Sequence, residues 1–288
     1  MKTMKRLVVL VFAISLVMAM SLQAMAATDI SVEKDKTSVV NVNCLYTEGG
    51  FEEGIPIQSG TGFVVDRRYV VVSYHAVNID AATKEMYAEY FGVTKEKFDE
   101  NTELWIYTTA GNYCSANIIF EDKQADIAIL KMKSSMSECS DVSFLSSSAV
   151  MAGDRCYTLG YPNVVTIYDE GENAVITIPG RVKDKKTIDG VECIGFNSDD
   201  GSTTAGPLVK EDGSVIGFVT SIESAGGNSS EYAVSADTLI RYFDKLGIAY
   251  DRQGSGTGTD PGEDSNRPAA PSSPSHVQED IRQPMIIW

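Results

Sequence analysis

The chain has 288 residues, of which 43% are apolar and 22% charged, with a formal net charge of −16 at pH 7. An acidic surface repels phosphate backbones, so this composition argues against a nucleic-acid-binding function. The length that remains between two terminal segments of different composition is typical of one two-lobed β domain.

The first terminal segment, residues 1–26, starts with basic residues, continues with the apolar run 7–20 and ends in Ala-Met-Ala. This order predicts a secretory signal peptide that is cut before Ala27. The apolar run is long for a signal peptide, so an uncleaved membrane anchor is the alternative. No other stretch approaches the roughly 20 apolar residues of a membrane-spanning helix. We therefore expect a secreted or extracytoplasmic protein with no further membrane segment.

The second terminal segment, residues 252–288, is rich in Gly, Ser, Pro and Asp and shows no apolar periodicity. Such a sequence cannot bury enough apolar surface to offset its ordering entropy, which predicts a disordered tail. Its last four residues, Met-Ile-Ile-Trp, are apolar but too few to span a membrane. Residues 27–251 are left as one folded domain.

Most of this domain consists of short apolar runs separated by turn residues, which predicts antiparallel strands. The predicted strands are 38–46, 60–65, 69–73, 104–109, 112–120, 153–160, 173–179, 190–197 and 213–221. A second lobe is expected to start near Ser140. After the last strand, Ser235 can cap a helix that continues to Leu246 and stops at Gly247.

Residues 80–102 interrupt this β pattern with a helical one. Gly92 can end a first helix, and Thr94 can begin a shorter second one. Four large apolar side chains recur at helical spacing and are expected on one face: Met86, Tyr87, Tyr90 and Phe91. The most common role for such a stripe is packing against the rest of the domain.

Four motifs carry a resemblance to a known family. They are Ser-Gly-Thr-Gly-Phe-Val-Val at 59–65, Ser-Tyr-His-Ala-Val at 73–77, Asp-Ile-Ala-Ile-Leu-Lys at 126–131 and Asp-Asp-Gly-Ser-Thr-Thr-Ala-Gly-Pro-Leu-Val at 199–209. In this order they resemble the trypsin-like serine proteases, nearest the HtrA/Deg branch. The resemblance implies an all-β fold of two six-stranded antiparallel barrels with a C-terminal helix. Residues 80–102 are then a helical insertion directly after the catalytic histidine, and we expect them beside the active-site cleft.

The resemblance also implies the catalytic residues. A lone histidine is usually structural, but His75 is the one histidine of residues 27–251 and lies within the second motif. It takes the place of the general base, and Asp126 takes that of the carboxylate that orients it, with Asp122 as the weaker alternative. Aligned on Gly-Pro-Leu, the nucleophile position holds Thr204 where the family has serine.

Two departures from the family pattern lie in this loop. The β-branched side chain of Thr204 fixes χ1 and adds a methyl group where the imidazole or the substrate approaches. Ser202 replaces a glycine whose N–H forms the oxyanion hole together with the N–H of the nucleophile, here Thr204. We expect peptide hydrolysis that is weak or lost. A pseudoprotease that binds extended peptides in its cleft is the alternative.

No cofactor or metal is expected, because none of the five cysteines has metal-ligand spacing or a nearby histidine. An odd number of cysteines leaves at least one unpaired, and one disulfide is compatible with the sequence. The expected partner is a peptide or protein substrate.

Overall fold

The computed structural model describes residues 32–47, 54–161, 175–199, 204–220 and 231–253. The predicted signal peptide lies outside these residues, as does the predicted tail from residue 254 onward. The first two residues of that tail, Arg252 and Gln253, belong to a strand.

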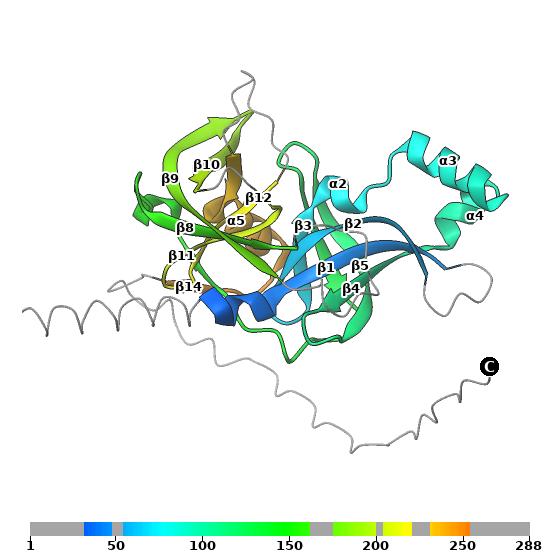
Figure 1. Cartoon of the computed structure of the whole chain (residues 1–288), viewed down its shortest axis with the longest axis horizontal. Coiled ribbons are helices and arrows are strands. Elements are labelled where there is room, and N and C mark those ends of the chain that lie inside the picture. Colours follow the sequence, from blue (N-terminus) through cyan, green and yellow to red (C-terminus); the bar gives the residue numbers. More distant parts are fainter. Residues whose placement is uncertain (1–31, 48–53, 162–174, 200–203, 221–230, 254–288) are drawn as a thin grey trace, which may run out of the picture. The chain divides into compact units, whose positions relative to one another are not determined.

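The first lobe is a closed six-stranded antiparallel barrel with strand order β1-β2-β3-β6-β5-β4 (Figure 1). Its strands are β1 (Val39–Tyr46), β2 (Ile55–Val65), β3 (Tyr69–Ser73), β4 (Thr102–Thr108), β5 (Tyr113–Asp122) and β6 (Ile127–Met132). Alternate residues face the barrel interior, as strand geometry requires. Val40, Val42, Val64 and Leu130 are among the side chains that fill it.

The second lobe is also a six-stranded antiparallel barrel, closed by the pairing of β11 with β12. Its strands are β8 (Arg155–Gly160), β9 (Ile176–Ile188), β10 (Val191–Ser198), β11 (Gly206–Lys210), β12 (Val215–Val219) and β13 (Glu231–Ser235). Two short strands, β7 (Ser143–Leu145) and β14 (Asp251–Gln253), extend the sheet in parallel beside β12. The expected double-barrel fold is confirmed.

A hydrophobic cluster with residues from both barrels lies between the two lobes. The ring centroid of Phe63 in β2 lies 5.8 Å from that of Phe218 in β12 and 6.0 Å from that of Phe144 in β7. Leu239 and Phe243 of α5 (Ala236–Leu246) are fully buried in the same cluster. Burying large aromatic side chains contributes strongly to stability, so this core holds the two lobes together.

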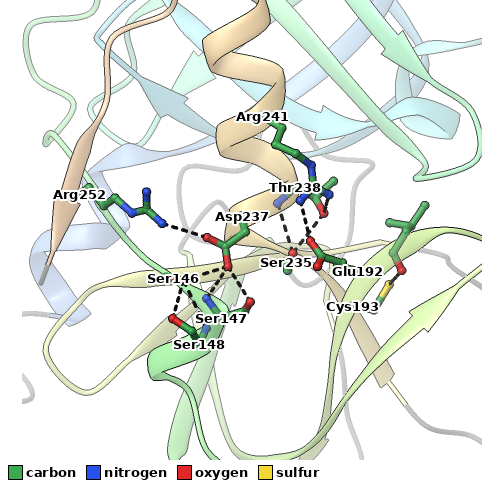
Figure 2. A network of polar contacts seen from close by, with 11 residues as sticks. Ser146, Ser147, Ser148, Glu192, Cys193, Ser235, Asp237, Thr238, Arg241 and Arg252 are labelled. Atoms are coloured by element: carbon green, nitrogen blue, oxygen red, sulfur yellow. Dashed lines mark hydrogen bonds and ion pairs between the residues drawn. The ribbon is translucent and has the colours of Figure 1, made fainter. Parts of the chain in front are cut away.

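Helix α5 begins and ends where the sequence predicts. The Ser235 hydroxyl accepts a hydrogen bond from Thr238 N at 3.2 Å, and Gly247 ends the helix in the left-handed region. Figure 2 shows that Asp237, in the first turn, accepts hydrogen bonds from the main-chain N–H and the hydroxyl of Ser147. Asp237 also forms an ion pair with Arg252. None of the helices in the described part of the chain combines the length and apolarity needed to cross a membrane.

The insertion forms two helices, α3 (Ala81–Phe91) and α4 (Lys95–Glu100), as expected. The expectation of a single apolar face is wrong. Tyr87 and Phe91 pack around Phe98, whereas Met86 and Tyr90 are 57% and 78% exposed. Successive residues are rotated by about 100° around a helix, so the two pairs point in different directions.

The insertion packs against one end of the first barrel. Its buried side chains pack on Tyr46 and Cys44, at the end of β1, and on Ile57 of β2. Figure 1 shows α3 and α4 extending from the first barrel on the side away from the second barrel. The insertion therefore borders the β1–β2 ribbon and not the junction of the two barrels.

Candidate active site

His75 lies on α2 (Tyr74–Val77), a single helical turn that begins where β3 ends. Ser73 precedes this turn in extended conformation, and Tyr74 N donates to the main-chain oxygen of Asp126 at 3.0 Å. β3 also pairs with β6, so the main chain before His75 is fixed beside the segment that carries Asp126. The family's short helical turn after a strand is found where the motif predicts it.

The carboxylate of Asp126 contacts His75 at two points. Its Oδ2 lies 2.7 Å from the imidazole Nδ1, and its Oδ1 accepts a hydrogen bond from the His75 main-chain N at 2.9 Å. A carboxylate at Nδ1 selects the tautomer with the proton on that nitrogen, so that Nε2 of the neutral ring can accept a proton. Sequence reasoning predicted this pair.

The pair has the electrostatics of an oriented base. The hydrogen bond to Asp126 raises the pKa of His75 above its usual value, partial burial acts against this, and the charge of Asp126 adds to it. The Asp126 side chain is 14% exposed and that of His75 is 54% exposed, so the carboxylate lies beneath a ring that solvent can reach. Asp126 adopts φ +52°, a left-handed conformation that Asp tolerates better than most residues.

Asp122, the weaker candidate for the orienting carboxylate, has different partners. Its Oδ1 accepts from the main-chain N of Gln124 and Ala125 at 3.0 Å, and its Oδ2 accepts from the Tyr242 hydroxyl at 2.8 Å. These bonds stabilise the turn before β6 and connect it to α5. Of the two carboxylates, Asp126 is the one that contacts His75.

Thr204 lies just before β11, and its hydroxyl is bound to main chain. Oγ1 donates to the carbonyl oxygen of Tyr161 at 3.1 Å and lies 3.3 Å from that of Ala205. The N–H of Tyr161 in turn donates to Thr61 Oγ1, in the first barrel, at 3.1 Å. Among the described residues, no hydrogen bond joins Thr204 to His75.

Gly160 makes room for the threonine. A Cβ at Gly160 would lie 2.6 Å from Thr204 Oγ1 and 2.8 Å from Thr204 Cγ2, closer than real Cβ contacts. The main-chain oxygen of Ala205 would be nearer still to such a Cβ, so Gly160 gives room to the main chain of this loop as well as to the Thr204 side chain. Sequence reasoning placed Gly160 in a strand and turn but missed its part in the site. The signal available was its position directly before Tyr-Pro, at the end of a predicted strand.

Ser202, the other residue predicted for the oxyanion hole, lies outside the described residues. Within the described ranges, no group of three or more His, Cys, Asp or Glu side chains could hold a metal ion. All five cysteines are buried and none forms a disulfide. Burial raises the pKa of the Cys44 thiol to about 12, which removes it as a nucleophile near neutral pH.

The sequence profile of the trypsin-like peptidase domain matches residues 60–218, which include His75, Asp126 and Thr204. This match covers more than half of the chain. The chain belongs to the trypsin-like peptidase family.

A curated relative places the protein near the HtrA branch of this family. Serine protease HTRA1 from Xenopus tropicalis is 25% identical over 234 residues, which are 79% of this chain and 44% of that protein. The chain thus spans less than half the length of this relative. The family match, the double-barrel fold and the four sequence motifs all indicate a trypsin-like peptidase domain.

Proposed function

We propose that this protein is a secreted endopeptidase of the trypsin-like family that hydrolyses peptide bonds with His75, Asp126 and Thr204. The observation that carries the proposal is the two-point contact of Asp126 with His75. A carboxylate that fixes both the main chain and Nδ1 of a half-exposed histidine is the arrangement a general base requires.

In the proposed reaction, Thr204 Oγ1 attacks the carbonyl carbon of the scissile bond while His75 Nε2 takes the hydroxyl proton. Asp126 stabilises the imidazolium that forms. The N–H groups of Ser202 and Thr204 bind the oxyanion. The intermediate collapses with loss of the amine, which receives the proton from His75, and leaves an ester on Thr204. Water, deprotonated by His75, then hydrolyses this ester and regenerates the hydroxyl.

Two features limit the rate of this reaction. The Thr204 hydroxyl has a single proton, which it donates to Tyr161 O. Rotation about χ1 must break this bond before the proton can reach His75. The β-branch of threonine restricts χ1, which opposes that rotation. We therefore propose low intrinsic activity.

The second candidate function is a pseudoprotease that binds extended peptides without cleaving them. The observation that favours it is the same donation of the Thr204 hydroxyl to Tyr161 O. Peptide capture needs a strand edge and pockets but no activated nucleophile.

The test is a substitution series in the mature domain, assayed with fluorogenic peptides and a fluorophosphonate probe. Thr204→Ser removes the methyl group and keeps the hydroxyl, so peptidase activity should rise. Adding Ser202→Gly should raise it further, because glycine allows the loop to direct its N–H to the oxyanion. Each effect is expected to be roughly 2–4 kcal/mol of barrier, and the two should not add fully because they act on one transition state.

The control is His75→Ala in the double variant, which must abolish the gain and so exclude a contaminating protease. A double variant that folds normally but neither hydrolyses peptides nor reacts with the probe would favour the pseudoprotease. N-terminal sequencing of protein exported from cells tests secretion, with Ala27 as the expected first residue.

A further inference from the structure

Both barrels contribute to the proposed catalytic residues. His75 and Asp126 lie at the ends of β3 and β6 in the first barrel, whereas Thr204 lies just before β11 in the second. A base can take a proton only from a hydroxyl within about 2.6–3.2 Å, so the direction of the Thr204 hydroxyl matters as much as its presence. Thr61 of β2 is the residue through which the first barrel fixes this direction.

The side chain of Thr61 contacts the second barrel at two atoms. It is 3% exposed, and pairing with Asn41 of β1 fixes its main chain. Its Oγ1 accepts a hydrogen bond from the N–H of Tyr161 at 3.1 Å. Its Cγ2 would lie 3.2 Å from a Cβ at Gly206, the first residue of β11, so the methyl group packs close to the main chain there. Thr61 therefore bears on the segment that binds the Thr204 hydroxyl and on the strand that follows Thr204.

Tyr161 connects Thr61 to the nucleophile position. This residue follows β8 and is 6% exposed. Its N–H donates to Thr61, and its C=O accepts from the Thr204 hydroxyl, also at 3.1 Å. Two successive hydrogen bonds thus join β2 to that hydroxyl. Without the Thr61 oxygen, the N–H of Tyr161 would be a buried donor with no partner, and the segment would have to move to satisfy it.

We infer that Thr61 is a positioning residue that keeps the Thr204 hydroxyl bound to Tyr161 O and directed away from His75. It acts through the main chain of Tyr161 and not by contact with the reacting atoms. The inference deepens the proposed function, since it names a residue that restrains the nucleophile. The control of Thr204 χ1 by Thr61 can nevertheless be measured without catalysis.

The first experiment determines the χ1 rotamer of Thr204 by NMR, in the mature chain with ¹³C-labelled threonine methyl groups. The Thr204 signal is assigned by its loss in Thr204→Ser. One rotamer should dominate in the parent, because the hydrogen bond and the β-branch both restrict χ1. Thr61→Val has nearly the same shape but accepts no hydrogen bond, so it should give a mixture of rotamers. Thr61→Ser keeps the hydroxyl and should keep the single rotamer.

The matched control is Thr37→Val. Thr37 Oγ1 accepts from the main-chain N–H of Ser140 at 3.1 Å, so this change removes the same kind of hydrogen bond between two residues outside the candidate active site. It should leave the Thr204 rotamer unchanged. Thr61→Ala, which places no methyl group against the Tyr161 N–H, should behave as Thr61→Val does and replaces it if the valine variant does not fold. A mixture of rotamers in the parent, or one unchanged rotamer in the folded Val and Ala variants, would overturn the inference.

The second experiment measures hydrolysis of fluorogenic peptides by the same proteins, all with Thr204 in place. Release of the hydroxyl should raise kcat in Thr61→Val about tenfold, the factor that corresponds to one net hydrogen bond, with KM nearly unchanged. Thr61→Ser and Thr37→Val should keep the parental kcat. An unchanged or lower kcat in Thr61→Val would contradict the restraint assigned to Thr61. If none of the proteins hydrolyses peptides, the proposed function fails, and the rotamer measurement alone decides the role of Thr61.

Discussion

At the scale of single residues, Asp126 determines how His75 can act. Its two oxygens hold the ring and the main chain of the same residue, which leaves the imidazole one orientation. Asp122 cannot take over this role, because its oxygens are bound to Gln124, Ala125 and Tyr242.

Asp126→Asn is expected to lower kcat/KM by roughly 10⁴-fold, because an amide neither fixes the tautomer nor stabilises the imidazolium. The acid limb of the pH–rate profile should also move to lower pH. His75 must be neutral to act as a base, and its pKa is raised chiefly by the hydrogen bond to Asp126, so activity is lost as pH falls through that raised value. Removing the carboxylate lowers the pKa.

The measurement is kcat/KM across about pH 4 to 9 in the Thr204→Ser background, with NMR titration of the His75 ring as a readout that is independent of turnover. Asp122→Asn is the control and should leave the acid limb unchanged. An unchanged His75 titration in Asp126→Asn would contradict the role assigned to this carboxylate.

At the scale of elements, the N-terminal segment of the described chain packs on the turn between β11 and β12. Asp35 is 6% exposed, its Oδ2 has no hydrogen-bond partner, and a Cβ at Gly213 would lie 2.6 Å from that oxygen. Burial raises the pKa of Asp35 to about 7, Lys34 acts against this, and Asp212 adds to it. The segment therefore carries a carboxyl group that prefers to be protonated in the folded protein.

This predicts a decrease in stability with rising pH. The folded state holds the Asp35 proton up to about pH 7, whereas the unfolded chain releases it near the ordinary aspartate pKa of 3.8. The contribution of Asp35 to the free energy of unfolding should fall between these two values, by roughly 4 kcal/mol, and then stay level. Asp35→Asn should remove this dependence, so the variant should be more stable than the parent above neutral pH.

Urea unfolding at a series of pH values checks this prediction. Asp212→Asn is the control: it removes a neighbouring negative charge and should shift the dependence only slightly to lower pH. Parallel stability curves for the parent and Asp35→Asn would show that Asp35 is already ionised in the folded protein.

At the scale of the whole molecule, the described fold continues past Asp251 to Gln253, the last residue of β14. β14 pairs with β7, and Arg252 forms an ion pair with Asp237, which also binds the Ser147 main chain (Figure 2). These contacts connect the end of the domain to the start of α5. They place the structural boundary two residues later than composition alone indicates.

Truncation after Gln253 should therefore leave the melting temperature nearly unchanged, because the predicted disordered tail buries almost nothing. Truncation after Tyr250 should lower it by several degrees, since it removes β14 and the partner of Asp237. Calorimetry on the two truncated proteins and the full mature chain makes the comparison. A large loss after Gln253 would mean that the tail contributes contacts of its own.

The sequence by itself determined the family, the double barrel, the His75–Asp126 pair and helix α5. These features depend on local signals: strand alternation, a serine cap, a terminal glycine, and motifs whose order is fixed by the family. The same signals predicted most strands within a few residues. They missed β7, β13, β14, the first half of β2 and the second half of β9, because these segments are defined by pairing with neighbouring strands and not by their own residues.

Only the tertiary structure decided how Thr204 is held and which face of the insertion is buried. Thr204 donates to Tyr161 O and lies against Gly160, and both of these residues are about forty positions earlier in the sequence. Tyr87 and Phe91 are buried while Met86 and Tyr90 are exposed because Tyr46 and Phe98 lie on one side of α3 only. Periodicity gives the spacing of side chains on an element, but the direction in which they are buried depends on what that element packs against.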